Sequence, residues 1–260
     1  MDKPTETKQR LKGLVMKLLV LGFWLLLWQL VYLWVGHDLL LSSPLSVFLT
    51  VLDFLKDLDF WKTILFSSLR IIAGFLLSLV IGVILSVASY KSRWISELIA
   101  PLMRIIKATP VASFIILALI WINSRNLSVL ISFLMVVPVV YMNVLQGLHE
   151  TDRKLLEMAK IFHITRRKMI TSVYIPSVMP YLITSVTVGL GFCWKSGIAA
   201  EVIGRPSGSI GERLYEAKLY IMTKELFAWT FVIIIISVLF EKIVMLLLQL
   251  LKKDRVNHNS

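Results

Sequence analysis

A lysine and a glutamate stand inside one of the long apolar stretches of the chain. The stretch runs from about Ser177 to Ile203, and the two ionisable residues are Lys195 and Glu201. An ionisable side chain within a membrane span is energetically costly and marks a functional site by default. Lys195 therefore faces a partner charge, a polar cavity or a translocation path, and a cation in such a path suits an anionic solute. We treat Lys195 and Glu201 as candidates for the path.

The sequence contains no cluster of residues that is typical of a catalytic or metal-binding site. The four histidines are dispersed, Cys193 is the single cysteine, and the acidic residues do not gather. This pattern predicts no metal site, no cofactor, no disulfide and no catalytic residue. The run GLGFCWKS at residues 189–196 is one residue from a phosphate-binding loop, but Trp194 stands where the last glycine must be. Its backbone amides cannot wrap a phosphate, so we expect no nucleotide site and no enzyme activity in this chain.

The polar stretch 149–172 predicts a helix–turn–helix. Asp152 can cap a first helix and Thr165 a second, basic one, before the chain re-enters the membrane at Pro176. A solvated basic loop would explain the charges of this stretch, but it would not explain the apolar stripe of the first helix. We therefore favour a docking surface for a partner protein. The stripe consists of Leu155, Leu156, Ala159, Ile161 and Phe162.

The elements that must position these residues are membrane spans. Hydrophobic residues make up 57% and charged residues 17% of the 260 residues, and the mean hydropathy is +0.80. Such a composition is typical of integral membrane proteins rather than soluble domains. We expect an all-α membrane protein with six transmembrane helices. They cover about Leu14–Val35, Ile64–Tyr90, Leu98–Ile122, Leu127–Leu148, Ser177–Ile203 and Leu226–Leu251.

Local signals refine three of these regions. Pro110 is expected to end or kink the third helix. The first apolar run is too long for a signal peptide, and we interpret it as an uncleaved anchor. Between the first two spans, Ser43 as N-cap and Pro44 as first helical residue predict a short amphipathic helix on the outer surface that reaches Leu58.

Charge asymmetry predicts the orientation of the spans. The net charge is +12, and with an inner amino terminus the inner stretches hold 17 Lys and Arg residues while the outer stretches hold 7. By the positive-inside rule both termini are cytoplasmic, and the basic excess needs no nucleic-acid partner. The predicted organisation is a cytoplasmic tail at 1–13, one six-helix transmembrane domain at 14–251 that includes the stretch 149–172, and a cytoplasmic tail at 252–260.

Two spans carry small residues at helical spacing, which lets another helix approach closely. We expect these ridges to be packing faces, within the subunit or across a dimer, and Cys193 needs no redox role there. The ridge of the second span is Gly74, Ser78, Gly82 and Ser86, and that of the fifth span is Ser185, Gly189, Cys193 and Gly197.

The stretch 149–172 and the residues after it resemble the E-A-A-x3-G-x9-I-x-L-P motif of ABC importer permeases. Glu157, Ala159 and Pro176 match the motif, while Met158, Val173 and Ile175 are apolar replacements. His163 replaces the family glycine that ends the first helix, a position of positive φ that histidine tolerates better than most residues.

Further fragments resemble the nitrate/sulfonate/taurine-type subfamily from about residue 40 to the carboxyl terminus. Where that subfamily usually has W-F-G-x-G, this chain has the residues 121–125, Trp-Ile-Asn-Ser-Arg, so the outer turn there differs. The matching fragments are Ser43-Pro44, Ser68-Leu69-Arg70, Gly74-Phe75, Pro101, Lys107-Ala108-Thr109-Pro110, Ala199-Ala200-Glu201-Val202-Ile203-Gly204, Pro206-Ser207-Gly208 and Gly211.

This resemblance implies a type I ABC importer permease fold and a role as the membrane subunit of an ATP-driven importer in a bacterial inner, or cytoplasmic, membrane. Its partners would be two ABC ATPase subunits on the coupling region, an extracytoplasmic substrate-binding protein and a second permease copy in a homodimer. The solute would be small and anionic, such as nitrate, a sulfonate or taurine. An aromatic vitamin precursor is the alternative substrate, and a stand-alone secondary transporter, a channel or a membrane enzyme are the alternative classes.

Overall fold

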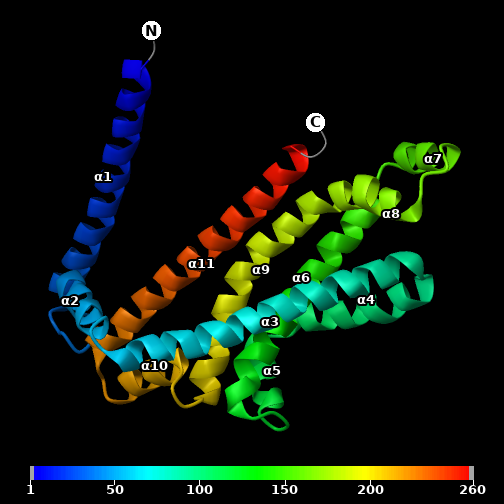
Figure 1. Cartoon of the computed structure of the whole chain (residues 1–260). Helices are drawn as coiled ribbons and strands as arrows, with labels where there is room; N and C mark the ends of the chain where they lie inside the picture. The colour runs from blue at the N-terminus through cyan, green and yellow to red at the C-terminus, as the bar shows by residue number, and fades with distance from the viewer. Residues whose placement is uncertain (1–2, 258–260) are drawn as a thin grey trace. The chain divides into compact units, whose positions relative to one another are not determined.

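The computed structural model describes the backbone of residues 3–257 and the side chains of residues 13 and 15–248. Within that part all regular structure is helical (Figure 1). The helices are α1 (Lys3–Val35), α2 (Pro44–Phe54), α3 (Leu58–Lys91), α4 (Arg93–Ala108), α5 (Val111–Ala118), α6 (Ser124–His149), α7 (Arg153–Ile161), α8 (Arg166–Met169), the π-helical turn η1 (Ile170–Tyr174), α9 (Ile175–Gly204), α10 (Ile210–Leu219) and α11 (Thr223–Asn257).

Five helical stretches are long and apolar enough to cross a membrane: α1, α3, α6, the stretch Arg166–Gly204 that ends in α9, and α11. The third predicted span is a broken pair, because α4 ends at Ala108, α5 begins at Val111, and the two helices are bent by 103°. Pro110 lies at the break, where its missing N–H and its ring prevent a continuous helix. The break predicted there is confirmed, and the pair makes a sixth span if its two halves are counted as one.

The helix ends differ in detail from the sequence-based expectation. α1 begins inside the expected tail 1–13 and α11 runs into the expected tail 252–260, while residues 1–2 and 258–260 lie outside the described part. Ser43 caps α2 as predicted, its Oγ accepting the Ser46 N–H at 3.1 Å. The prediction that this helix reaches Leu58 is wrong. α2 ends at Phe54, because Asp57 Oδ1 accepts the Asp59 N–H at 3.0 Å and starts α3 there.

The chain divides into two compact units, of which the first comprises residues 1–60 and 213–232. Within it the Trp28 indole donates to the Ser42 carbonyl at 3.1 Å, and the Thr223 hydroxyl donates to the Leu39 carbonyl at 2.6 Å. The rings of Phe54, Phe60 and Trp229 lie 5.1–5.8 Å apart between centroids. Aromatic packing and backbone bonds therefore join the ends of α1, α2 and α11 in this unit.

The second unit comprises residues 61–212 and 233–260, and its core is α6. α6 packs most extensively against α9 and also contacts α4 and α5. Its buried side chains belong to two apolar clusters. The first contains Ile115, Leu127, Ile131 and Ala200, and the second Met103, Val137 and Tyr141.

Both small-residue ridges lie against this core. A Cβ on Gly197 would come within 2.6 Å of Ile71 Cγ1 and 2.7 Å of Ser132 Oγ, and one on Gly82 within 2.7 Å of Val140 Cγ1. Gly74 meets Val129 and Ser132 on α6, Gly189 meets Val136 and Phe75, and Ser78, Ser86, Ser185 and Cys193 are fully buried. Within this unit the missing side chains let helix backbones approach closely, and hydroxyls bridge them: Ser86 donates to the Tyr141 carbonyl at 2.9 Å.

Candidate coupling region and membrane groove

The sequence of α7 explains why a helix forms at residues 153–161. Asp152 is its N-cap, with the side chain accepting the Lys154 N–H at 2.8 Å. At the other end His163 has φ of +48°, the Ile164 N–H donates to the Ala159 carbonyl at 2.9 Å, and the His163 N–H donates to the Lys160 carbonyl at 3.1 Å. The left-handed residue and the bond that reaches back over it are those of a Schellman-type helix end. The positive φ predicted at His163 is confirmed.

α7 buries very little of itself in this chain. Ala159 is its buried residue, at 1% exposure, whereas Ile161 and Phe162 are 73% and 70% exposed. Leu155 and Met158 are exposed as well. Clustered apolar side chains that face outward beside basic residues mark an interaction site rather than an ordinary soluble surface.

Glu157 lies exposed on this helix. An acidic side chain at this position of a helix can pair locally with Arg153 or Lys154. Neither pair forms: among the described side chains, no ion pair involves Glu157. Its carboxylate is therefore available to a partner surface.

The second helix of the region is the short basic helix predicted after Thr165, but it is not separate from the next span. Thr165 occupies the N-cap of α8 but makes no side-chain cap bond, and α8 continues through η1 directly into α9. The motif residue Val173 is buried within the π-turn, and Pro176 follows in the first turn of α9. Tyr90 packs edge-on against His149 at 5.3 Å and Tyr174 at 6.1 Å between ring centroids, so this turn is anchored to the ends of α3 and α6.

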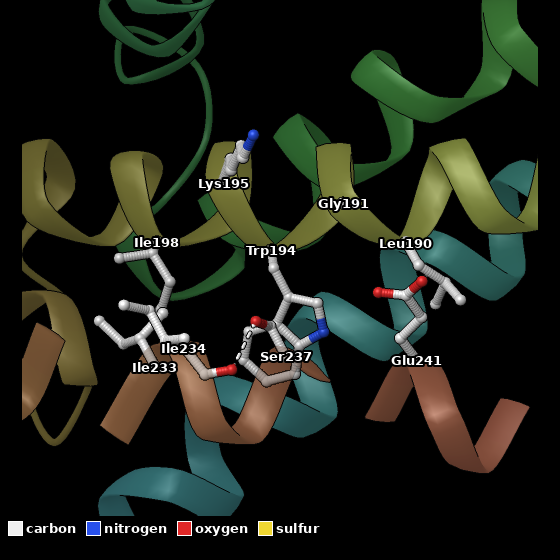
Figure 2. A pocket seen from close by; sticks show the side chains of 9 residues that line it. All are labelled: Leu190, Gly191, Trp194, Lys195, Ile198, Ile233, Ile234, Ser237 and Glu241. Atoms are coloured by element: carbon white, nitrogen blue, oxygen red, sulfur yellow. Dashed lines mark hydrogen bonds between the residues drawn. The ribbon is translucent and has the colours of Figure 1, made fainter. Parts of the chain in front are cut away.

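A groove lies between α9 and α11 within the second unit (Figure 2). Its volume is about 320 Å³, and most of its lining is apolar. Lys195 lines it, but Figure 2 shows the lysine side chain directed away from Trp194 and α11. The remaining lining residues are Leu190, Gly191, Trp194, Ile198, Ile233, Ile234, Ser237 and Glu241.

Glu201, the other path candidate, does not line this groove. It is 0% exposed, and its Oε2 accepts the Ser67 hydroxyl at 2.7 Å and the Gly211 N–H at 3.4 Å. Ser67 Oγ in turn accepts the Ile210 N–H at 2.9 Å. The first amides of α10 thus meet a carboxylate and a hydroxyl, which is the favourable arrangement at a helix N-terminus.

The approach between α9 and α10 depends on Gly211. A Cβ at this position would collide with the backbone and Cβ of Glu201 and with the Val202 nitrogen. Ser209 and Glu212 form a reciprocal cap, the Glu212 N–H donating to Ser209 Oγ at 3.0 Å and the Gly208 N–H to Glu212 Oε2 at 2.6 Å. The stretch 205–212 is therefore fixed onto the end of α9.

Sequence reasoning missed three residues that the structure makes prominent. Glu241 is an ionisable residue inside a span, and the rule that selected Lys195 would have found it. Ser67 shows its importance only through Glu201, 134 residues away. Arg125 stands in the divergent outer turn, and its carbonyl accepts a 2.7 Å hydrogen bond from Arg70 Nε.

The structure has several apolar spans, a helix between two of them with exposed apolar side chains, and a groove with ionisable residues within the spans. These features are those of a multi-pass membrane transport subunit. Residues 74–256 match the family described as binding-protein-dependent transport system inner membrane component. The chain belongs to this family of ABC transporter permeases.

Relatives with transport names match over most of the chain. The putative aliphatic sulfonates transport permease protein SsuC of Bacillus subtilis is 24% identical over 251 residues, which are 96% of this chain and 90% of that protein. The bicarbonate transport system permease protein CmpB of Synechococcus elongatus is 25% identical over 81% of this chain and 79% of its own length. The taurine transport system permease protein TauC of Escherichia coli is 24% identical over 71% of this chain and 67% of its own length.

Proposed function

We propose that this chain is the membrane-spanning subunit of an ATP-driven importer for a small solute of the sulfonate, taurine, nitrate or bicarbonate type. The observation that carries the proposal is α7. It exposes Met158, Ile161 and Phe162 together with an unpaired Glu157, and it buries Ala159 alone. An ATPase subunit that covers this face would bury the apolar side chains and give the carboxylate a cationic partner. The names of the relatives support the solute class.

The proposed topology has six spans, with the bent pair α4–α5 as the third and both termini in the cytoplasm. The excess of Lys and Arg in the stretches assigned to the inside supports it. α7 and α8 then lie on the cytoplasmic side of a bacterial inner membrane, where ATP is available. α2 and the stretch 204–225 lie outside, where a substrate-binding protein would dock.

The proposed assembly has two copies of this chain and two ATPase subunits. α1 is compatible with lipid or with a second copy around it, since its apolar side chains are broadly exposed.

When the ATPase subunits close on ATP, they would carry the two α7 helices together. Because α8, η1 and α9 are continuous, a push on α7 is passed along one helical stretch to the residues around Lys195. The chain would thus convert a rigid-body movement into alternating access.

Lys195 and Glu201 have different proposed roles in this path. Lys195 is exposed, lies inside a span and lines the groove between α9 and α11. Its ammonium would attract the anionic group of a solute to the groove. Glu201 would act through position, by holding α10 and the stretch 205–212 at the outer end of α9.

The proposal is tested by purifying an affinity-tagged chain from membranes of its own cells in mild detergent. We expect a separate ATP-binding chain to be recovered in equal amount, and ATP hydrolysis in the purified fraction. The matched control is the same chain with α7 residues 155–162 replaced by a polar helical sequence, which should insert in the membrane but lose the ATPase. Uptake of solute by the chain alone in liposomes, without ATP or an ATPase, would instead favour a stand-alone transporter.

A further inference from the structure

The groove of Figure 2 contains a buried hydrogen-bond donor without an acceptor. Trp194 is 3% exposed, and its Nε1 has no hydrogen-bond partner among the residues that the structure describes. The ring lies edge-on against Phe240, at 6.1 Å between centroids and 68° between planes. Figure 2 shows the indole pointing from α9 into the groove, with its nitrogen on the side of Glu241. An unpaired buried N–H is costly, and an acceptor that enters the groove would remove that cost.

A carboxylate faces the same space without a counter-ion. Glu241 lies within the span formed by α11 and lines the groove. In the described part of the chain its carboxylate forms no ion pair or hydrogen bond. Lys195, the cation that also lines the groove, is turned away from it in Figure 2. A carboxylate in a membrane span needs a positive partner, and the one cation that lines this groove forms no ion pair with it.

The rest of the groove limits the size of its occupant. Its apolar lining suits a short hydrocarbon segment and includes Leu190, Ile198, Ile233 and Ile234. A Cβ on Gly191 would meet nothing within 4 Å, so the glycine leaves part of the space open. A volume of about 320 Å³ is at the lower end of small-molecule sites, which range from roughly 300 to 1,000 Å³.

We propose that the groove between α9 and α11 binds a small zwitterion, with its anionic group on Trp194 Nε1 and its ammonium on Glu241. The inference rests on the proposed transport function only in taking this zwitterion to be the solute that passes. A bare anion would satisfy Trp194 but be repelled by Glu241. A simple amine would leave the indole unpaired, and a lipid chain would leave both groups unpaired. A short amino-sulfonate or amino-carboxylate gives Trp194 Nε1 an acceptor and Glu241 a cation, and it places its carbon segment against the apolar lining.

The first test measures the electrostatic effect of Glu241 in the groove, through the reaction rates of two charged thiol reagents. Ser237→Cys places a thiol on its wall, and the complete importer is reconstituted in nanodiscs, where the native Cys193 is buried. Two methanethiosulfonate reagents of equal length are compared, one ending in an ammonium and one in a sulfonate. We expect the ammonium reagent to react at least about tenfold faster, because the Glu241 carboxylate, four residues further along α11, attracts it in a medium of low effective dielectric. Adding Glu241→Gln should remove this ratio, whereas Glu225→Gln, on the same helix outside the groove, should leave it.

The second test measures which small molecules bind in the groove, through their protection of the thiol. 2-Aminoethanesulfonate should protect the Ser237→Cys thiol, while ethanesulfonate and ethylamine at the same concentration should protect it at least fivefold less. Trp194→Phe keeps the ring against Phe240 but removes the N–H, so it should weaken protection about tenfold without changing the ammonium reagent's rate. Gly191→Leu should fill the groove and abolish protection.

Equal rates for the two reagents, or equal protection by ethanesulfonate, would overturn the proposal. Absence of protection by 2-aminoethanesulfonate, with normal labelling of the thiol, would also overturn it and would point to a groove filled by lipid or by a second copy. These results do not depend on the transport cycle. If the ATPase fails to co-purify, the proposed function fails while the labelling ratio still reports on the groove. If the ATPase binds normally and the ratio is one, the zwitterion site alone is wrong.

Discussion

The Ser67 hydroxyl donates a 2.7 Å hydrogen bond to Glu201 Oε2, and both side chains are fully buried although 134 residues separate them. The same carboxylate accepts the Gly211 N–H, and Ser67 accepts the Ile210 N–H. One buried pair thus joins α3, α9 and the start of α10. The glutamate selected from the sequence for its charge is, in the structure, the centre of a joint between three helices.

Replacing Glu201 should therefore affect stability before it affects transport. Glu201→Ala leaves the Ser67 hydroxyl and the Gly211 N–H without their acceptor and opens a cavity, so we expect a loss of about 2–4 kcal/mol. Glu201→Gln keeps an acceptor and the volume and should lose much less. Thermal unfolding of the purified complex measures both. An equal melting temperature for Glu201→Ala and the parent chain would show that the hydrogen bonds of Glu201 contribute nothing to stability.

Gly197 tests the close packing of α9 against α3 and α6. Gly197→Ala would bring a methyl group within 2.6 Å of Ile71 and 2.7 Å of Ser132 Oγ, which donates to the Cys193 carbonyl at 3.1 Å. We expect destabilisation of about 1–3 kcal/mol, since a filled helix interface cannot accept extra volume without moving. The control is Gly191→Ala on the same helix, where the methyl group meets open space and helix propensity improves. Thermal melting should fall for the first variant and not for the second.

The sequence predicted the helices of this chain better than it predicted how they join. Long apolar runs, the Ser43 cap, the break at Pro110 and the αL residue His163 are local properties, and each is present. The end of α2 depended on a competing cap at Asp57, which no periodicity reveals. The Ser67–Glu201 joint and the Trp194–Glu241 groove depend on contacts between distant segments. A single sequence carries no direct signal for such contacts.

His163→Gly tests whether the imidazole has a role beyond its backbone conformation. A glycine at a φ of +48° avoids the strain of a side chain there, which offsets its larger loss of backbone entropy. We expect unchanged ATPase binding and transport, with thermal stability equal or slightly raised. His163→Val should lower stability, because a β-branched residue is poorly tolerated in the left-handed region. A loss of transport in His163→Gly with the ATPase still bound would assign the imidazole a direct contact.

Single cysteines test the topology. Lys56 and Ser207 are exposed in segments assigned to the outside, and Lys154 is exposed in α7 on the assigned inside. Cysteines at the first two positions should react with an impermeant thiol reagent on intact cells, while one at Lys154 should react only after permeabilisation. The parent chain serves as the blank, because Cys193 is fully buried. Labelling at Lys154 in intact cells would reverse the orientation and remove α7 from the side where ATP is found.

The most direct test of the account is substrate-stimulated ATP hydrolysis by the reconstituted importer when the exposed face of α7 is changed. Phe162 is 70% exposed and Glu157 forms no ion pair with any described side chain, so a combined Glu157→Ala and Phe162→Ala variant leaves the fold of this chain nearly untouched. Loss of a buried interfacial charge contact costs about 2–5 kcal/mol, so ATPase binding and stimulated hydrolysis should fall at least about tenfold. Glu150→Ala, an exposed acidic residue just before α7, is the matched control and should behave as the parent. If the double variant keeps its ATPase and its full stimulation, α7 is not the coupling element and the central claim is wrong.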